Sequence, residues 1–202
     1  MDLAGTWAVS FPLLIVDRET VKLQRDLRQI YNELRLGGLL TAYAYFLGNR
    51  AITDTYTRLL QLLQTYFSRH DLPLPPETKE LQNAKTNAQN KWRQLVDDFV
   101  TSSSAVSVSY WFTHRGLLTR TNLIAQDFVY DQTNVVMVDV AYQTQAYALH
   151  WISEDDERVC PVCQRYAEGG NHGYYLLNWY MPAAFPPVHP NCRCRIEILY
   201  QN

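Results

Sequence analysis

Apolar residues recur at spacings of three and four positions along most of the first 150 residues, with charged and polar side chains between them. This is the period of an α-helix that buries one face. Between residues 17 and 50 the apolar residues keep this helical spacing with occasional departures, and they are Val21, Leu23, Leu27, Ile30, Leu34, Leu39 and Leu40. The pattern predicts a helix that begins near Asp17, a good N-cap residue, and that Gly37 and Gly38 kink or divide.

Two further helices are predicted between residues 52 and 100. Residues 52–70 have a helical period, and the proline-rich residues 71–76 end that helix because proline cannot continue it. Residues 77–100 form the next helix, whose first half is polar nearly all round. That half is either a solvated face or a face for a partner outside the chain, and we favour the solvated alternative.

The pattern is helical again over residues 114–130 and 133–151, although β-branched residues weaken the prediction for the second stretch. Residues 102–112 are compatible with a loop, a strand or the start of a helix. The sequence therefore predicts about five helices before residue 151.

The character of the chain changes at residue 151. From there on it is rich in glycine, proline and aromatic residues, and it holds every cysteine. Residues 167–173 read as a loop, and the end of the chain alternates with period two. Cys192, Cys194, Ile196 and Ile198 share one side of this stretch, and Arg193, Arg195 and Glu197 share the other. Such alternation predicts a half-buried β-strand.

Charge and composition narrow the function classes. The 202 residues include 18 Lys and Arg against 20 Asp and Glu, so no overall basic excess argues for free nucleic-acid binding. The N-terminal residues do not resemble a signal peptide, and the apolar run over residues 37–48 is too short for a membrane span. We expect a soluble intracellular protein with reduced thiols and no membrane contact.

The cysteines and one histidine are spaced like the ligands of a zinc ion. Cys160 and Cys163 are two residues apart, and His189 and Cys192 repeat that spacing. Zinc takes about four nitrogen or sulfur ligands in a tetrahedron, and a loop that returns to close the site explains the long separation of the pairs. Cys194 is an alternative fourth ligand, and we favour Cys192.

Other interpretations of these residues remain open. The cysteines could form two disulfides, or Cys160 and Cys163 could be a redox pair, although no βαβ unit is evident around them. His172, in the glycine-containing loop, is a weaker candidate for metal contact. A closed site of three cysteines and one histidine has no open position for water, so its role would be structural. The last fifty residues have few aliphatic side chains, and metal binding would supply their folding free energy.

The sequence thus predicts an α+β fold that is mainly α. A helical region, residues 1–150, serves partner binding or oligomerisation. It precedes a small zinc-stapled module, residues 151–202, that ends in a β-strand. Phosphate-binding glycine loops, serine-hydrolase elbows and zinc-protease motifs are absent from the sequence. The acidic residues 154–157 are more readily explained as a solvated cap than as catalytic groups, so we expect no enzyme and no small-molecule substrate.

The C-terminal segment resembles the signature of the phage Mu F-like minor head proteins, also called phage head morphogenesis proteins. The resemblance covers residues 133–202, and the matching positions are Trp151, Asp155, Asp156, Glu157, Cys160, Cys163, Gly169, Pro186, Pro187, His189, Pro190, Cys192, Arg193 and Cys194. Many members carry Thr-Glu near the start of the preceding helix, where this chain has Val138 and Asp139.

The resemblance implies a minor capsid protein of a tailed bacteriophage. Such a protein binds the portal protein and other head components, and it acts in head assembly and in DNA packaging or delivery. Its expected location is the virion, inside the capsid or at the portal vertex, after assembly in the host cytoplasm. Arg193 and Arg195 are candidates for contact with packaged DNA, or they are simply exposed arginines on an edge strand.

Two other functions compete with this one. The first is a zinc-ribbon-like nucleic-acid-binding protein with a helical oligomerisation domain, and the second is a metal-dependent nuclease.

Four aromatic residues of the C-terminal module could face a partner or form the core of the module, and we favour the core. They are Tyr174, Tyr175, Trp179 and Tyr180.

Overall fold

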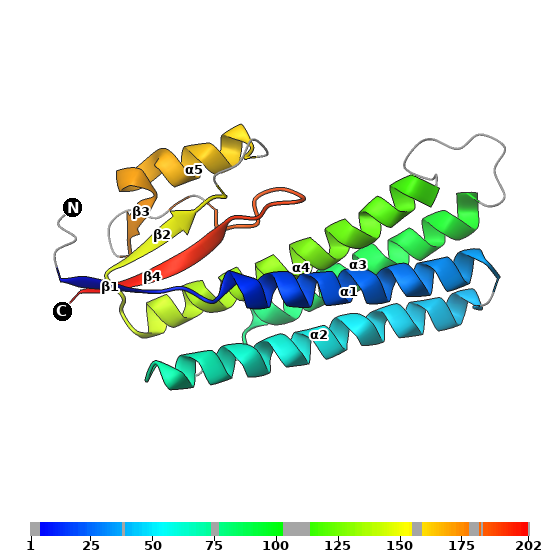
Figure 1. The fold of residues 1–202 in the computed structure, drawn as a ribbon, viewed down its shortest axis with the longest axis horizontal. Coiled ribbons are helices and arrows are strands. Elements are labelled where there is room, and N and C mark those ends of the chain that lie inside the picture. Colours follow the sequence, from blue (N-terminus) through cyan, green and yellow to red (C-terminus); the bar gives the residue numbers. More distant parts are fainter. Residues whose placement is uncertain are drawn as a thin grey trace.

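Four long helices form an antiparallel bundle that makes up most of the molecule (Figure 1). The computed structural model describes residues 5–37, 39–73, 77–102, 114–154, 159–177, 182 and 184–201. The bundle helices are α1 (Leu13–Arg35), α2 (Thr41–Arg69), α3 (Lys79–Ser102) and α4 (His114–Gln143). Each packs on its neighbour in the chain, and α4 closes the bundle by packing on α1 as well as on α3.

The bundle core comes from the apolar stripes of the helices. On α1, the buried positions at helical spacing are Val16, Glu19, Thr20, Leu23, Leu27, Ile30, Tyr31 and Leu34. On α2, Gly48 packs against the buried ring of Trp92 of α3, whose indole nitrogen donates to the Ala44 carbonyl at 3.1 Å. A Cβ atom at Gly48 would lie 1.9 Å from that nitrogen, so the close approach of α2 and α3 requires glycine there.

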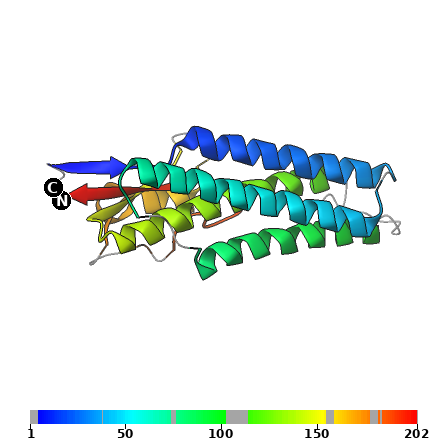
Figure 2. The ribbon, with the colours of Figure 1, turned by 90° about the horizontal axis from the view of Figure 1, so that it is seen from below.

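A four-stranded antiparallel sheet lies at one end of the bundle. Its strands are β1 (Thr6–Val9), β2 (Ala148–Ile152), β3 (Tyr174–Leu176) and β4 (Arg195–Gln201), in the order β1-β4-β2-β3. The short helix α5 (Pro161–His172) covers one face of the sheet, and α4 packs on the other (Figure 1). The N- and C-terminal strands pair, so both ends of the chain lie at this end of the molecule (Figure 2).

The predicted fold class is confirmed, since the described residues are mainly helical with a small C-terminal sheet. The chain divides near Gly37, and β4 has the predicted alternation, with Ile196 and Ile198 buried. The predicted boundary at residues 150 and 151 falls inside β2, and β1 joins the same sheet. Residues 103–113, which hold most of the stretch of ambiguous pattern, lie outside the described residues.

Two expectations were wrong, and a third was right in part. In the described part of the chain four helices, not about five, precede residue 151, because residues 114–143 form one helix and residues 148–152 form a strand. The predicted loop at residues 167–173 begins two residues later, since Ala167 and Glu168 are helical in α5, residues 169–171 have non-helical backbone, and His172 and Gly173 have positive φ. β4 is an interior strand of the sheet and not an edge strand.

The end of the bundle far from the sheet carries exposed apolar side chains. They lie where α1 ends, where α2 begins and near the end of α3, and we call them the distal tip: Leu36, Leu40, Tyr43, Phe46 and Val100. Tyr43 and Phe46 stack on each other, and Leu40 is 81% exposed. Among the described residues, no helix is long and apolar enough to cross a bilayer.

Candidate metal centre

The first pair of predicted ligands forms the N-terminus of α5. Cys160 is the N-cap residue, and its sulfur accepts a hydrogen bond from the Cys163 backbone N–H at 3.3 Å. Pro161 occupies the first helical position, where its missing N–H costs nothing. One turn of helix thus presents both sulfurs, and the positive end of its dipole favours thiolates.

The second pair of predicted ligands lies in a tight turn. The Cys192 N–H donates to the His189 carbonyl at 3.1 Å, which closes the four residues His-Pro-Asn-Cys. Asn191 has a φ of 64°, and proline followed by asparagine with positive φ is typical of a type II turn. The sequence therefore fixes the separation of His189 and Cys192 by turn chemistry.

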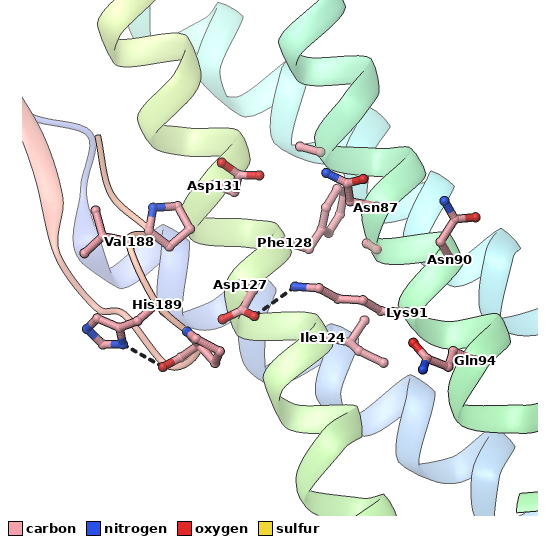
Figure 3. A pocket seen from close by; sticks show the side chains of 14 residues that line it. Asn87, Asn90, Lys91, Gln94, Ile124, Asp127, Phe128, Asp131, Val188 and His189 are labelled. Atoms are coloured by element: carbon pink, nitrogen blue, oxygen red, sulfur yellow. Dashed lines mark hydrogen bonds and ion pairs between the residues drawn. The ribbon is translucent and has the colours of Figure 1, made fainter. Parts of the chain in front are cut away.

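The ring of His189 is oriented for ligation by Nε2. Its Nδ1 lies 2.7 Å from the Pro190 carbonyl, as Figure 3 shows, and only a protonated nitrogen can donate to that oxygen. The Nε2 lone pair is then free to face the thiols, 3.0 Å from the Cys160 sulfur and 2.9 Å from the Cys163 sulfur. A hydrogen bond at the other ring nitrogen is how proteins commonly hold a metal-ligating histidine.

The five predicted candidates form one cluster. The ligand atoms of Cys160, Cys163 and His189 lie within 4.8 Å of one another, and so do those of Cys163, Cys192 and Cys194. All four cysteines are free thiols, and the Cys163 and Cys192 sulfurs are 3.7 Å apart. The two predicted pairs, which are far apart in the sequence, therefore meet at Cys163.

The separation of the Cys163 and Cys192 sulfurs is that expected around a tetrahedral metal ion. Metal–sulfur bonds of about 2.3 Å in a tetrahedron place two sulfurs about 3.8 Å apart, and the Cys163–Cys192 distance of 3.7 Å matches this. The nitrogen–sulfur distances are those of hydrogen bonds, shorter than a tetrahedral ion would hold. A donor set of thiolates and one imidazole suits zinc and other borderline-soft ions, and does not suit magnesium or calcium.

The thiols differ in acidity. Burial alone would raise the pKa of Cys160. The backbone N–H groups of Cys163 and Val162, which lie at the Cys160 sulfur, outweigh burial and lower that pKa. A hydrogen bond from Cys194 lowers the pKa of Cys192 to about 5. Burial raises the pKa of Cys163 to about 12, and the bond to Cys192 together with burial raises that of Cys194.

Trp151 of the resembling signature and two tyrosines outside it pack beside the cluster. The ring of Trp151 is buried, and it stacks on Tyr166 of α5 with ring centroids 4.6 Å apart. Tyr175 is buried under α5, and its hydroxyl donates to the Tyr166 carbonyl at 2.7 Å. The core role favoured for Tyr175 is therefore the one observed, whereas Tyr174 stacks on His150 at 4.1 Å. Trp179 and Tyr180 lie outside the described residues.

The acidic stretch contributes one described side chain. Glu154 lines the small cavity beside Cys160 and Cys194, and its Oε1 accepts from Arg195 at 2.7 Å. Arg195 is thus paired within the chain. Asp155, Asp156 and Glu157 lie outside the described residues. His172 is the last residue of α5, and it belongs to neither group of side chains that could hold a metal among the described residues.

Sequence reasoning missed two polar side chains of α4 that hold the segment bearing Cys192 and Cys194. Asp127 accepts from the Asn191 N–H, and the buried Asn134 bonds to the backbone of Cys194 and Ile196. Both lie on a helix that carries many other polar residues, and their partners lie about sixty residues away in sequence, so no pattern identifies them.

Comparisons with protein-family models, with curated proteins and with solved structures find no match to this chain.

Proposed function

We propose that the cluster binds one zinc ion through Cys160, Cys163, His189 and Cys192, and that this zinc is structural. The observation that carries the proposal is the arrangement of Nε2 and three sulfurs around Cys163, with Nδ1 committed to the Pro190 carbonyl. Four protein ligands leave no position for a reacting water. The ion would join the start of α5 to the turn that contains His189 and Cys192, and so hold α5 on the sheet.

We further propose that the protein is a minor capsid protein of a tailed bacteriophage, which acts at the portal vertex in head assembly. Support comes from the signature that resembles the Mu F-like minor head proteins. Its described residues, which run from Trp151 to Cys194, gather into one unit in which Trp151 backs α5 and the cysteines and histidine meet. A signature whose members meet in space is better support than one matched by spacing alone.

The distal tip suits the contact with the portal protein. Exposed apolar side chains that gather at one end of a fold are typical of protein–protein interfaces. The tip lies at the end of the bundle away from the sheet, whereas the metal centre lies beside Asp127, near the middle of α4 (Figure 1). The protein would then dock by the tip of its bundle and leave the sheet and the metal centre exposed to other head components.

The nucleic-acid alternative has weaker support. The net charge is −2, and Arg195, one of the two arginines considered for DNA contact, is engaged by Glu154. Binding to DNA is driven largely by cationic side chains that neutralise phosphates, so such a function requires a basic surface. Contact with packaged DNA remains a secondary element of the proposal.

Co-purification tests this function. The chain is co-expressed with the portal protein of the same phage, and the portal ring is isolated by a tag on the portal protein alone. We expect the chain to remain bound to the ring through size-exclusion chromatography, and antibodies to detect it in purified particles. Its absence from both ring and particles, together with DNA binding that weakens steeply with salt, would favour the nucleic-acid alternative.

A further inference from the structure

We infer that Asp127 and Asn134 of α4 are positioning residues for the metal centre, which hold the segment Asn191–Ile196 in its ligating conformation before the metal binds. The inference rests on the proposed metal centre. Residues of the helical bundle would then contribute to metal affinity, which the spacing of the cysteines and the histidine does not indicate.

Asp127 anchors the start of the segment. Its Oδ1 accepts from the Asn191 backbone N–H at 3.1 Å, and Asn191 lies within the turn between His189 and Cys192. Its Oδ2 accepts from Lys91 of α3 at 3.1 Å, across the groove between α3, α4 and the turn (Figure 3). The Asp127 side chain is 12% exposed and that of Lys91 is 52% exposed, so the carboxylate is largely buried but its ion pair with Lys91 is open to water.

Asn134 anchors the end of the segment. Its Nδ2 donates to the Cys194 carbonyl at 3.1 Å, and its Oδ1 accepts from the Ile196 N–H at 2.9 Å. The side chain is 1% exposed, and both ends of its amide are used. These bonds fix the backbone on both sides of residue 195, where the ligand segment becomes strand β4.

The two anchors act together because of their spacing. They lie seven positions apart, two turns of α4, and so share the face of that helix that meets the ligand segment. Cys192 and Cys194 lie between the two anchored points, so neither sulfur can move far without breaking a buried hydrogen bond. A site already ordered by the bundle spares the metal the entropic cost of ordering those residues, and this raises its affinity.

Zinc affinity separates this role from a general stabilising one. Zinc dissociation constants are measured by competition with a chromophoric chelator for the full chain and its Asp127→Ala variant. Loss of groups that orient metal ligands lowers affinity about 10- to 100-fold, and we expect a decrease in this range for Asp127→Ala. Asp127→Asn keeps an oxygen acceptor for the Asn191 N–H and should recover most of the affinity.

Two control variants isolate the contact with the turn. Lys91→Met removes the ion pair with Asp127 but leaves the Asn191 bond, and Asp131→Asn changes a carboxylate one helical turn further along the same groove. Both should bind zinc as the unmodified chain does. With Co²⁺ as the probe, Asp127→Ala should also weaken the visible absorption bands of a tetrahedral thiolate site while its far-ultraviolet circular dichroism stays that of the folded chain, a combination that unfolding does not produce.

The outcomes are distinguishable. If the unmodified chain binds neither zinc nor Co²⁺, the proposed metal centre is wrong, and the inference is wrong with it. If the unmodified chain binds zinc and Asp127→Ala binds it equally tightly with an unaltered Co²⁺ spectrum, the metal centre stands and the positioning role is overturned.

Discussion

Replacing Cys163 with serine is expected to release the metal and to free α5 and β3 from the rest of the fold. Cys163 is the donor at which both ligand pairs meet, and its sulfur contacts His189 and Cys192. Structural zinc supplies on the order of 10 kcal/mol to a small module at neutral pH, and the few apolar side chains of α5 cannot replace that. Hydrogen exchange should rise over residues 159–177 and 184–194.

The bundle should survive this change, since its core is formed by α1 to α4, and β1, β2 and β4 stay paired on α4. We expect the far-ultraviolet circular dichroism to keep most of its helical signal. The near-ultraviolet circular dichroism signal from the stacking of Trp151 on Tyr166 should be lost.

Val162→Ser is the matched control, because Val162 lies between the two cysteines and is 45% exposed. A Cys163→Ser protein that keeps its metal and its protection from exchange would show that Cys163 is not a ligand.

The second large effect is expected at the distal tip. The double variant Leu40→Glu with Phe46→Glu should fold normally but lose at least about tenfold in affinity for the portal ring, as expected when an exposed apolar anchor is removed. Both side chains are exposed, at 81% and 55%, so the unfolding free energy should change by no more than about 0.5 kcal/mol. Binding is measured by titration of the ring with labelled chain.

A control of equal chemistry is available on α1. Leu14 and Val21 are 80% and 62% exposed and lie outside the distal tip, and Leu14→Glu with Val21→Glu adds the same charge. This pair should bind the ring as the unmodified chain does. If the α1 pair abolishes binding and the tip pair does not, the portal contact lies elsewhere on the bundle.

The helices and the ligand cluster were predictable because local rules determine them. The three-and-four spacing on α1 reflects a helix with one buried face, and the turn at Gly37 follows from the residues that interrupt it. The pairing of Cys160 with Cys163, and of His189 with Cys192, survives in the structure as a helix N-terminus and a type II turn. Each pair is a local unit, and a metal ion is the simplest reason for both to exist.

The errors arose where burial or distant pairing overrides local pattern. α4 is buried by α1, α3 and β4, so its apolar residues show no single stripe, and the continuous helix and the following strand were misread. β1 forms only because it pairs with β4 from the other end of the chain. α5 was missed although Cys160 at the N-cap and Pro161 after it are helix-start signals; Gly169 and Gly170 suggested a loop instead.

The metal content of the protein tests the central claim most directly. The chain is purified in its native state without added metal or chelator, and zinc is measured by elemental analysis beside a titration of its thiols. We predict about one zinc per chain, with all four cysteines reduced and reactive only after the metal is removed. A folded, metal-free chain, or one whose cysteines are joined in disulfides, would contradict the account.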